Sequence, residues 1–464
     1  MSGTFAISAE RQRRFAGLAG DFNPLHTDEL YARKTLFGKQ VVHGIHQLMF
    51  LLERAAEKID GPFFPVQIKA DFNNALGVDE PFTVELAIAQ SKGTATLRTT
   101  DGTVCTTASF DFETEGGTGN VPDASFPETR PAVPEEFDVS GVTETVGYDK
   151  RLMKDLFPAL SEKGAEFPSG VLLASTRVVG MKYPGLQSIY NGLTLTFEKK
   201  AGSRLTYDVK RHAALNAVVV TITGDGVKGR LKTMIRPASK EQTPLKELAS
   251  LRLEGCAGQR ALIVGGSRGI GLQCLRLLGL SGAETLFTCF KNKSDAESVR
   301  NEFSGNGLKT DFIQFDVNAP SPEALERIFL FRPTHLYYFA TPKISAGTGV
   351  LSEDRFNAFA RTYIFALEAL IKAGGMNELK GVFAPSSVAI DELPKDMVEY
   401  AFAKAAMEVF ARWVEKSRRL RFYAPRFPRI ETDQTQNVLN VPAEKAENVL
   451  IRELSIFLNM EAEK

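Results

Sequence analysis

The sequence has little histidine, little cysteine, one tryptophan and no net charge, and each shortage narrows the functions to consider. The four cysteines are Cys105, Cys256, Cys274 and Cys289. They form no CxxC pair and have no histidine pair nearby, so we expect neither a disulfide framework nor a metal site. Lysine plus arginine equals aspartate plus glutamate at 56 each, which gives no reason to expect binding to nucleic acid or a membrane surface.

Long apolar runs are also absent. No stretch has the length and apolarity of a bilayer-spanning helix, and the N-terminal residues lack the apolar core of a signal peptide. The hydrophobic and charged fractions, 43% and 24%, are ordinary for globular proteins. At 464 residues the chain has room for roughly two to four domains. We therefore expect a soluble, cytoplasmic protein of several domains.

What the sequence does have is a dense polar motif near its start. Residues 20–26 read Gly-Asp-Phe-Asn-Pro-Leu-His, with Asp21 and His26 five positions apart. A carboxylate and an imidazole together can hold a water molecule at one carbon and move a proton at the neighbouring carbon. The simpler alternative is a turn with a helix cap, since Asp, Asn and Pro favour such positions. Two further histidines lie nearby, and we expect His43 and His46 to have packing or supporting roles.

A second segment follows, in which residues 37–44 read Phe-Gly-Lys-Gln-Val-Val-His-Gly before an apolar, helical run. A helix that begins at Gly44 would direct its first backbone N–H groups at a thioester oxygen as it becomes enolate-like. The two segments resemble the signature of the R-specific enoyl-CoA hydratases, the MaoC-like branch of the hotdog fold. The resemblance implies that Asp21 and His26 are catalytic, and that Asn23 and Gly44 bind substrate.

The rest of the first domain, which we place at residues 1–118, has the pattern of strands. Apolar and polar residues alternate over 66–72, 82–88 and 95–100, with Gly or Asp at the breaks. A long helix followed by antiparallel strands is what a hotdog requires. The stretch 113–136 is rich in Gly, Pro, Thr and Glu and is typical of a linker.

Residues 138–240 repeat this layout without the Asp-x-Asn-Pro-x-His motif. Helical segments begin near Tyr148, and strand-like runs follow at 193–197, 205–210 and 217–223. We expect a second, non-catalytic hotdog that completes an α+β double hotdog and buries the edge strand of the first. An unrelated β-rich domain remains the alternative.

The composition changes again after residue 253. Residues 260–271 read Arg-Ala-Leu-Ile-Val-Gly-Gly-Ser-Arg-Gly-Ile-Gly, a buried strand that runs into a glycine-rich turn and a helix. Further strands near 284–290, 311–315 and 335–339 alternate with helical segments. This βαβ series predicts a Rossmann-like α/β domain with a doubly wound parallel sheet, at residues 257–464.

The glycine-rich turn suits a dinucleotide, because a pyrophosphate binds where such a turn opens a helix. On its own this signal is weak, since tight turns need glycine for packing alone. The residues that we expect to bind cofactor here are Gly265, Ser267, Arg268, Gly269, Ile270 and Gly271.

A catalytic group is expected farther along this domain. Ser387 follows a strand, and Tyr400 and Lys404 are four positions apart on one helix face, where the ammonium would lower the pKa of the phenol. With the glycine-rich turn, this set resembles the short-chain dehydrogenase/reductase family, particularly the 3-oxoacyl carrier-protein reductases. The resemblance implies that Ser387, Tyr400 and Lys404 are catalytic and that Asp316 and Val317 contact adenine.

Several positions depart from that family. Tyr338-Phe-Ala-Thr replaces its usual Asn-Asn-Ala-Gly, and Tyr363 stands where the family has an asparagine that supports the lysine. Pro425-Arg426 replaces a Pro-Gly, and the tail after Thr432 has a helical segment at 443–459 but no obvious final strand. These changes leave open whether the domain is active.

The choice of cofactor follows from charge. A site that prefers NAD has an acidic residue about 20 positions beyond the glycines. Here that region is Phe-Thr-Cys-Phe-Lys291-Asn-Lys and carries no acid. Arg268 and Lys291 could instead bind a 2′-phosphate, which favours NADPH and the direction of reduction.

The two sites together predict consecutive steps on one acyl thioester, bound to CoA or to an acyl carrier protein. The first is NADPH-dependent reduction of a 3-oxoacyl to a (3R)-hydroxyacyl thioester, and the second is dehydration to the trans-2-enoyl thioester, in fatty-acid or polyketide biosynthesis. One alternative is a degradative hydratase and NAD-dependent dehydrogenase. Another is an active hydratase with a non-catalytic, nucleotide-binding scaffold domain. A homodimer is also left open.

Overall fold

The computed structural model describes residues 3–115, 117–119, 121–212, 215–238, 242–342, 344, 349–373, 378–418, 420–431 and 442–462. The chain divides into two compact units, the first ending at Ser239 and the second beginning at Lys240. Each unit is described by itself below. Among the described residues, no helix has both the length and the apolarity that a membrane crossing requires.

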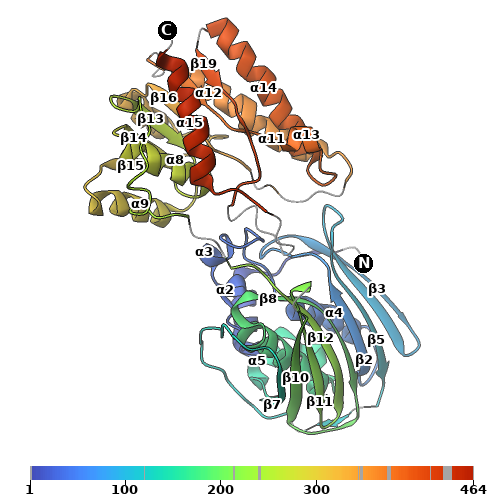
Figure 1. Cartoon of the computed structure of the whole chain (residues 1–464). Coiled ribbons are helices and arrows are strands. Elements are labelled where there is room, and N and C mark those ends of the chain that lie inside the picture. Colours follow the sequence, from blue (N-terminus) through green and yellow to red (C-terminus); the bar gives the residue numbers. More distant parts are fainter. Residues whose placement is uncertain are drawn as a thin grey trace. The chain divides into compact units, whose positions relative to one another are not determined.

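The first unit is built on a ten-stranded antiparallel sheet that curves around its helices (Figure 1). Its five-stranded halves meet where β2 pairs with β8, from Gln67↔Thr196 to Asp71↔Gly192. In order across the sheet, the strands are β1 (Thr4–Phe5), β3 (Phe82–Ala89), β4 (Lys92–Thr99), β5 (Val104–Glu113), β2 (Phe64–Phe72), β8 (Ser188–Phe197), β12 (Val227–Ile235), β11 (Ala217–Gly224), β10 (Arg204–His212) and β7 (Val139–Thr145). A small parallel pair joins β6 (Thr118–Gly119) to β9 (Lys200–Ala201).

The longer helices of this unit cover the concave face of the sheet and share a hydrophobic core with it, whereas the short helices that follow α1 contribute Leu25 and Ala32 to a separate small cluster. The long helix α4 is almost wholly buried, as a hotdog requires, and it packs on β3, β4 and β5. The double-hotdog prediction is therefore confirmed. The helices are α1 (Ala9–Ala19), α2 (Pro24–Thr27), α3 (Glu29–Ala32), α4 (Gly44–Glu57), α5 (Lys150–Leu156), α6 (Pro158–Glu162), α7 (Glu166–Arg177), the π-helix η1 (Val178–Lys182) and the 3-10 helix η2 (Gly185–Gln187).

Part of the predicted linker at 113–136 contacts the rest of the first unit. Phe126 lies with its ring 3.9 Å from the guanidinium carbon of Arg177. A Cβ on Gly20 would come within 2.6 Å of the same ring, so this position requires glycine. Gly20 also has a left-handed φ of 68° and ends α1 just before the polar motif.

The second unit has a six-stranded parallel sheet in the order 3-2-1-4-5-6, which confirms the doubly wound prediction. The strands, in the order of the chain, are β13 (Arg260–Val264), β14 (Glu284–Cys289), β15 (Thr310–Gln314), β16 (His335–Tyr338), β17 (Gly381–Phe383) and β19 (Arg421–Tyr423). Successive residues of β13 enter different cores, Ile263 on one face and Leu262 and Val264 on the other. A strand buried on both faces must be apolar throughout, which explains its sequence.

Helices flank both faces of this sheet (Figure 1). The predicted C-terminal helix is present as α15, and in the described part of the chain the parallel sheet ends at β19. A two-residue pair joins β18 (Ser386–Ser387) to β20 (Arg426–Phe427). The helices are α8 (Gly269–Leu280), α9 (Lys293–Gly305), α10 (Pro322–Phe331), α11 (Glu353–Ala360), the π-helix η4 (Arg361–Ala366), α12 (Leu367–Lys372), α13 (Ala389–Glu392), α14 (Val398–Arg418) and α15 (Ala446–Ala462).

Candidate active sites

The polar motif forms the turn between α1 and α2. Asn23 caps α2, its side-chain oxygen accepting a hydrogen bond from the Leu25 N–H at 3.1 Å, and Pro24 occupies the first helical position. The simpler interpretation of this sequence, a turn with a cap, is therefore also correct. The same turn brings Asp21, His26 and His43 together, and this cluster has the properties of a chemical site.

Asp21 is a buried carboxylate, 1% exposed, with specific partners. Its Oδ1 accepts a hydrogen bond from the Asn23 N–H at 3.2 Å, and its Oδ2 accepts one from the Thr176 hydroxyl at 2.7 Å. His43 Nε2 lies 3.5 Å from Oδ2. Burial alone would raise the pKa of Asp21, but His43 and the Thr176 hydrogen bond together hold this pKa below its usual value. Asp21 is therefore an anion at neutral pH.

His26 is a neutral base beside that anion. Its Nδ1 lies 2.8 Å from the carbonyl oxygen of Val41, which can only accept, so Nδ1 carries the proton and Nε2 presents its lone pair. The ring stacks on His43 with centroids 3.8 Å apart. Burial, followed by the repulsion from His43, lowers the pKa of His26 to about 3. A carboxylate and an unprotonated imidazole side by side can hold a water molecule and accept a proton from carbon.

A glutamine that the sequence analysis did not single out connects the two other histidines of this region. Gln12 Nε2 lies 2.6 Å from His43 Nδ1, and Gln12 Oε1 lies 2.8 Å from His46 Nδ1, so one amide contacts both rings. His43 Nε2 lies 3.1 Å from the main-chain oxygen of Asp21. His46 also stacks on Phe15 with centroids 4.2 Å apart. The predicted supporting role fits His43, whose orientation this chain of bonds determines.

The α7–η1 segment, which belongs to the second half of this unit, contributes directly to the Asp21 site. Thr176 is the next-to-last residue of α7, and Gly180 in η1 approaches the carboxylate so closely that a Cβ there would lie 2.2 Å from Oδ1. Asn23, predicted to bind substrate, uses its amide to hold this segment, since Nδ2 donates to the carbonyl oxygens of Gly180 at 3.0 Å and Gly185 at 3.1 Å. Its side chain is fully buried.

Gly44, the other predicted substrate contact, is the first residue of α4. The N-cap residue of this helix is His43, and its side chain accepts no hydrogen bond from the first N–H groups of α4. A Cβ on Gly44 would lie 2.8 Å from the ring of Phe72, so only glycine fits there. Both facts suit a helix start that approaches a substrate oxygen.

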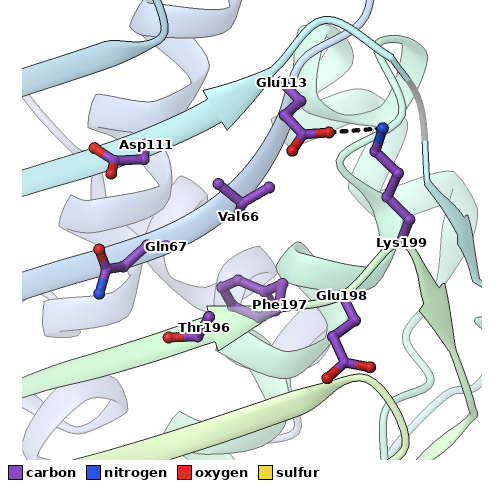
Figure 2. Close-up of a pocket in the computed structure, with 8 residues that line it drawn as sticks. All are labelled: Val66, Gln67, Asp111, Glu113, Thr196, Phe197, Glu198 and Lys199. Carbon is purple, nitrogen blue, oxygen red and sulfur yellow. Dashed lines mark ion pairs between the residues drawn. The ribbon is translucent and has the colours of Figure 1, made fainter.

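A shallow pocket elsewhere in this unit has no part in the cluster. Figure 2 shows its lining, which comes from β2, β5 and the end of β8, with Glu113 and Lys199 in an ion pair at 2.6 Å. None of the predicted site residues lines it.

In the second unit the glycine-rich turn connects β13 to α8 as predicted. Gly265 and Gly269 have positive φ values of 83° and 58°. A Cβ on Gly271 would lie 2.2 Å from the Gly265 oxygen, so the turn can close only with glycine there. Arg268 is the N-cap of α8, and its side chain makes no cap hydrogen bond. Ser267 lies in this turn, and Ile270 packs against the core.

The end of β14 lies beside the turn, because the Gly265 N–H donates to the Thr288 hydroxyl at 3.0 Å. Lys291, three residues after Thr288, is exposed. Asp316 and Val317 follow β15 at the carboxyl edge of the same sheet, and Asp316 Oδ1 accepts a hydrogen bond from the Asn318 N–H at 2.9 Å. All the predicted cofactor residues thus lie at the edge of the sheet where nucleotides bind in this architecture.

Ser387, Tyr400 and Lys404 come together as predicted. Ser387 lies in β18, and its hydroxyl is hydrogen-bonded to Tyr400 on α14. The Lys404 Nζ lies 5.9 Å from the centre of the Tyr400 ring and donates to the Pro385 oxygen at 2.6 Å. Burial lowers the pKa of Lys404 to about 7.

One detail of that prediction is wrong. Burial raises the pKa of Tyr400, and the Ser387 hydrogen bond, not Lys404, opposes this rise. The expected lowering by the ammonium is absent because Lys404 is directed at Pro385 and at the ring of Tyr363, 3.9 Å from its Nζ.

The two tyrosine departures are structural. The Tyr338 hydroxyl donates to the Thr362 oxygen at 2.7 Å. Tyr363 is 1% exposed, and its hydroxyl lies 2.6 Å from that of Thr341. An aromatic ring above Lys404 thus replaces the asparagine of the family.

Residues 3–106 match the family model described as the MaoC like domain, and residues 259–329 match the short chain dehydrogenase model. Both resemblances drawn from the sequence are therefore confirmed at the level of the domain. The matches cover the polar motif and Gly44 in the first domain, and the glycine-rich turn in the second. No curated protein sequence matches the chain.

Solved structures resemble part of the chain. A short-chain dehydrogenase from Burkholderia cenocepacia in complex with NADP is 21% identical, with 44% of this chain and 92% of that chain covered and a TM-score of 0.39. A dehydrogenase/reductase from Sinorhizobium meliloti is 20% identical, with 46% and 91% covered and a TM-score of 0.38. A blue fluorescent protein from a metagenomic library, in complex with NADPH, is 19% identical, with 45% and 91% covered and a TM-score of 0.38.

Proposed function

We propose that this chain, which carries a MaoC-like domain ahead of a short-chain dehydrogenase domain, is a bifunctional enzyme that acts on acyl thioesters. The second domain reduces a 3-oxoacyl group to a (3R)-hydroxyacyl group, and the first removes water to give the trans-2-enoyl thioester. We assign the catalytic hotdog to residues 1–118, the non-catalytic hotdog to 138–240 and the reductase to 257–464. The observation that carries the proposal is the anionic Asp21 beside the unprotonated His26.

In the dehydration step His26 Nε2 accepts the proton from C2 of the hydroxyacyl thioester. Asp21 accepts a hydrogen bond from the C3 hydroxyl and holds it in place. The proton on His26 then leaves with the hydroxyl oxygen as water, so that His26 and Asp21 return to their starting states. The start of α4 at Gly44 stabilises the charge that develops on the thioester oxygen. Asn23 positions the α7–η1 segment against Asp21.

In the reduction step Tyr400 supplies the proton to the C3 oxygen and Ser387 holds that oxygen. NADPH, when bound, supplies the hydride. Its pyrophosphate suits the start of α8, and Arg268 and Lys291 provide cations for the 2′-phosphate. We assign Asp316 and Val317 to contacts with the adenine.

A second candidate function is an active hydratase with a reductase domain that binds nucleotide without turnover. The direction of Lys404 toward Pro385 and Tyr363 favours it, since that ammonium then contributes little to lowering the pKa of Tyr400. A degradative enzyme that hydrates enoyl-CoA and oxidises the alcohol with NAD is the third.

One experiment separates these functions. The protein is incubated with NADPH and 3-oxoacyl thioesters, on CoA and on an acyl carrier protein, and the products are identified by mass. We expect enoyl and 3-hydroxyacyl products with the wild type, and neither with Tyr400→Phe, which should still hydrate added enoyl thioester. Wild-type binding of NADPH without reduction would support the scaffold function, and a preference for NAD would support the degradative one.

We also propose that the protein forms a homodimer through α14 and η4, which pack side by side. Phe365, Phe402, Val409 and Trp413 are 66%, 45%, 57% and 50% exposed, so these two helices present four large apolar side chains to solvent. The last three recur at helical spacing on one face of α14.

A further inference from the structure

Arg236 is a buried cation whose described partners are all neutral. It follows β12 in the first unit and is 1% exposed. Its Nη2 donates to the Tyr31 hydroxyl at 2.8 Å and to the Leu186 carbonyl oxygen at 2.6 Å. Its Nε and Nη1 are buried and have no hydrogen-bond partner in the part of the chain that the structure describes. Burying a charge without a counter-charge is energetically unfavourable, so we infer that this side chain has a functional role.

The guanidinium lies beside the polar motif. Tyr31 belongs to α3, directly after the helix that carries His26. The Leu186 oxygen that binds Arg236 also accepts a hydrogen bond from Asn23 Nδ2 at 3.4 Å. One carbonyl thus separates Arg236 from the turn that holds the catalytic pair. The charge of Arg236 also reaches His26, whose pKa it lowers in addition to the larger effects of burial and His43.

We propose that Arg236 binds an anionic substituent of the acyl group, so that the Asp21–His26 site acts on acyl thioesters that carry a carboxylate near the reacting carbons. This inference rests on the proposed hydratase and dehydratase function and names its substrate class. The phosphates of the carrier are excluded as the anion because the whole pantetheine arm separates them from the thioester. The Tyr31 ring, 5.5 Å from the guanidinium carbon, makes a cation–π contact but supplies no counter-charge.

The test compares two matched trans-2-enoyl-CoA substrates of equal chain length, one ending in a methyl group and one in a carboxylate. We expect the wild type to hydrate the carboxylate substrate with the higher kcat/KM. Arg236→Leu should lower that value about 10²-fold, mainly through KM, because it removes the partner of a buried charge. The kcat/KM for the methyl substrate should change less than about threefold. Arg236→Lys should restore part of the lost kcat/KM for the carboxylate substrate, since lysine keeps the charge but not the planar fork of arginine.

A binding measurement keeps this inference separate from the proposed function. Butanoyl-CoA and succinyl-CoA cannot be hydrated, and they serve as unreactive probes in thermal unfolding. The carboxylated probe should raise the Tm of the wild type more than butanoyl-CoA does, and this difference should vanish in Arg236→Leu. Without ligand, Arg236→Leu should have a Tm equal to or above that of the wild type, because an uncompensated charge is removed.

Equal losses on both substrates, or a lower Tm of Arg236→Leu without ligand, would show a structural arginine and overturn the inference. Hydration of the methyl substrate alone would also overturn it while leaving the proposed function intact. Failure to hydrate either substrate, with the selective Tm difference still present, would overturn the proposed function and retain Arg236 as a carboxylate-binding residue.

Discussion

At the scale of single residues, the ionisation states in the first unit determine what the site can do. Asp21 has partners that favour its anion, while burial and His43 keep His26 unprotonated. Since the pKa of His26 is lowered to about 3, its titration should not limit the rate anywhere between about pH 5 and pH 8.

We predict that Asp21→Asn and His26→Ala each lower the rate of hydration by about 10²–10⁴-fold, the usual contribution of a proton-transfer group. Reduction of 3-oxoacyl thioesters with NADPH should continue in both variants, because the reductase residues lie in the other unit. Hydration of an enoyl-CoA is followed by loss of its ultraviolet absorbance, with circular dichroism as the control for folding. Near-native hydration in both variants would reject the site.

A second prediction concerns Lys404, whose pKa burial lowers from 10.5 to about 7. We propose that Lys404 also contacts the nicotinamide ribose, as the resemblance to the short-chain dehydrogenase/reductase family implies. The ammonium is lost as the pH rises through about 7, so NADPH binding should weaken between pH 6 and pH 9. The stability of the fold should change in the opposite direction. Below about pH 7 the buried ammonium destabilises the folded state, and this penalty is relieved as the pH rises from about 7 toward 10.5. Fluorescence titration of NADPH measures the first effect. Lys404→Arg keeps its charge and should show a flat profile, and a flat wild-type profile would contradict the prediction.

At the scale of elements, the site depends on a helix from the half that lacks the motif. The Thr176 hydroxyl on α7 donates to Asp21 across 155 positions of sequence. We predict that Thr176→Val lowers kcat/KM for hydration by about 10-fold, in line with a hydrogen bond to a charged group. It should also raise the pKa of Asp21, because a bond that lowers that pKa is lost. The acid limb of the pH–rate profile then moves to higher pH.

Thr176→Ser is the matched control, since it keeps the hydroxyl and should retain both the rate and the profile. A valine variant that matches the wild type in rate and in pH profile would reduce Thr176 to a packing residue.

The glycine-rich element of the second unit gives another prediction. Replacing Arg268 and Lys291 together by alanine should weaken the binding of NADPH far more than the binding of NADH, because only the 2′-phosphate of NADPH interacts with those charges. Arg268→Ala alone should have the larger effect, since arginine binds phosphate through a planar fork and lysine as a point charge. Dissociation constants for both nucleotides provide the measurement. Equal weakening of both, or a wild-type preference for NADH, would contradict this choice of cofactor.

How far the sequence predicts the site depends on the distance between its residues along the chain. Asp21, His26 and Gly44 lie in two neighbouring segments with strong local patterns, and the structure brings them to one turn and one helix start. Gln12 and Thr176 have no local signal, because their partners lie 31 and 155 positions away. The Tyr400 environment was misjudged for a similar reason, since Pro385 and Tyr363 draw Lys404 away from it.

At the scale of the whole molecule, the exposed apolar face of α14 and η4 predicts self-association. Trp413, the one tryptophan of the chain, is half exposed on this face. Its fluorescence should shift to the blue as protein concentration rises through the dissociation constant of the dimer. Phe365→Ser with Val409→Ser should remove the shift and give a monomer in sedimentation, with Leu330→Ser, at another exposed position, as the control. A monomeric wild type at high concentration would reject the dimer.

The pairing of β2 with β8 determines how the protein can be dissected. Cutting the chain near residue 118 would leave β2 with a long, unpaired edge and would remove α7 and η1 from Asp21. Such a fragment would contain the complete motif and yet be prone to aggregate. The shortest fragment that we expect to fold alone and to keep the partners of Asp21 therefore extends through β12 to about residue 238. It is about twice as long as residues 1–118, the domain to which we assign the motif. In this protein the segment that carries the motif is therefore shorter than the segment that it needs in order to fold.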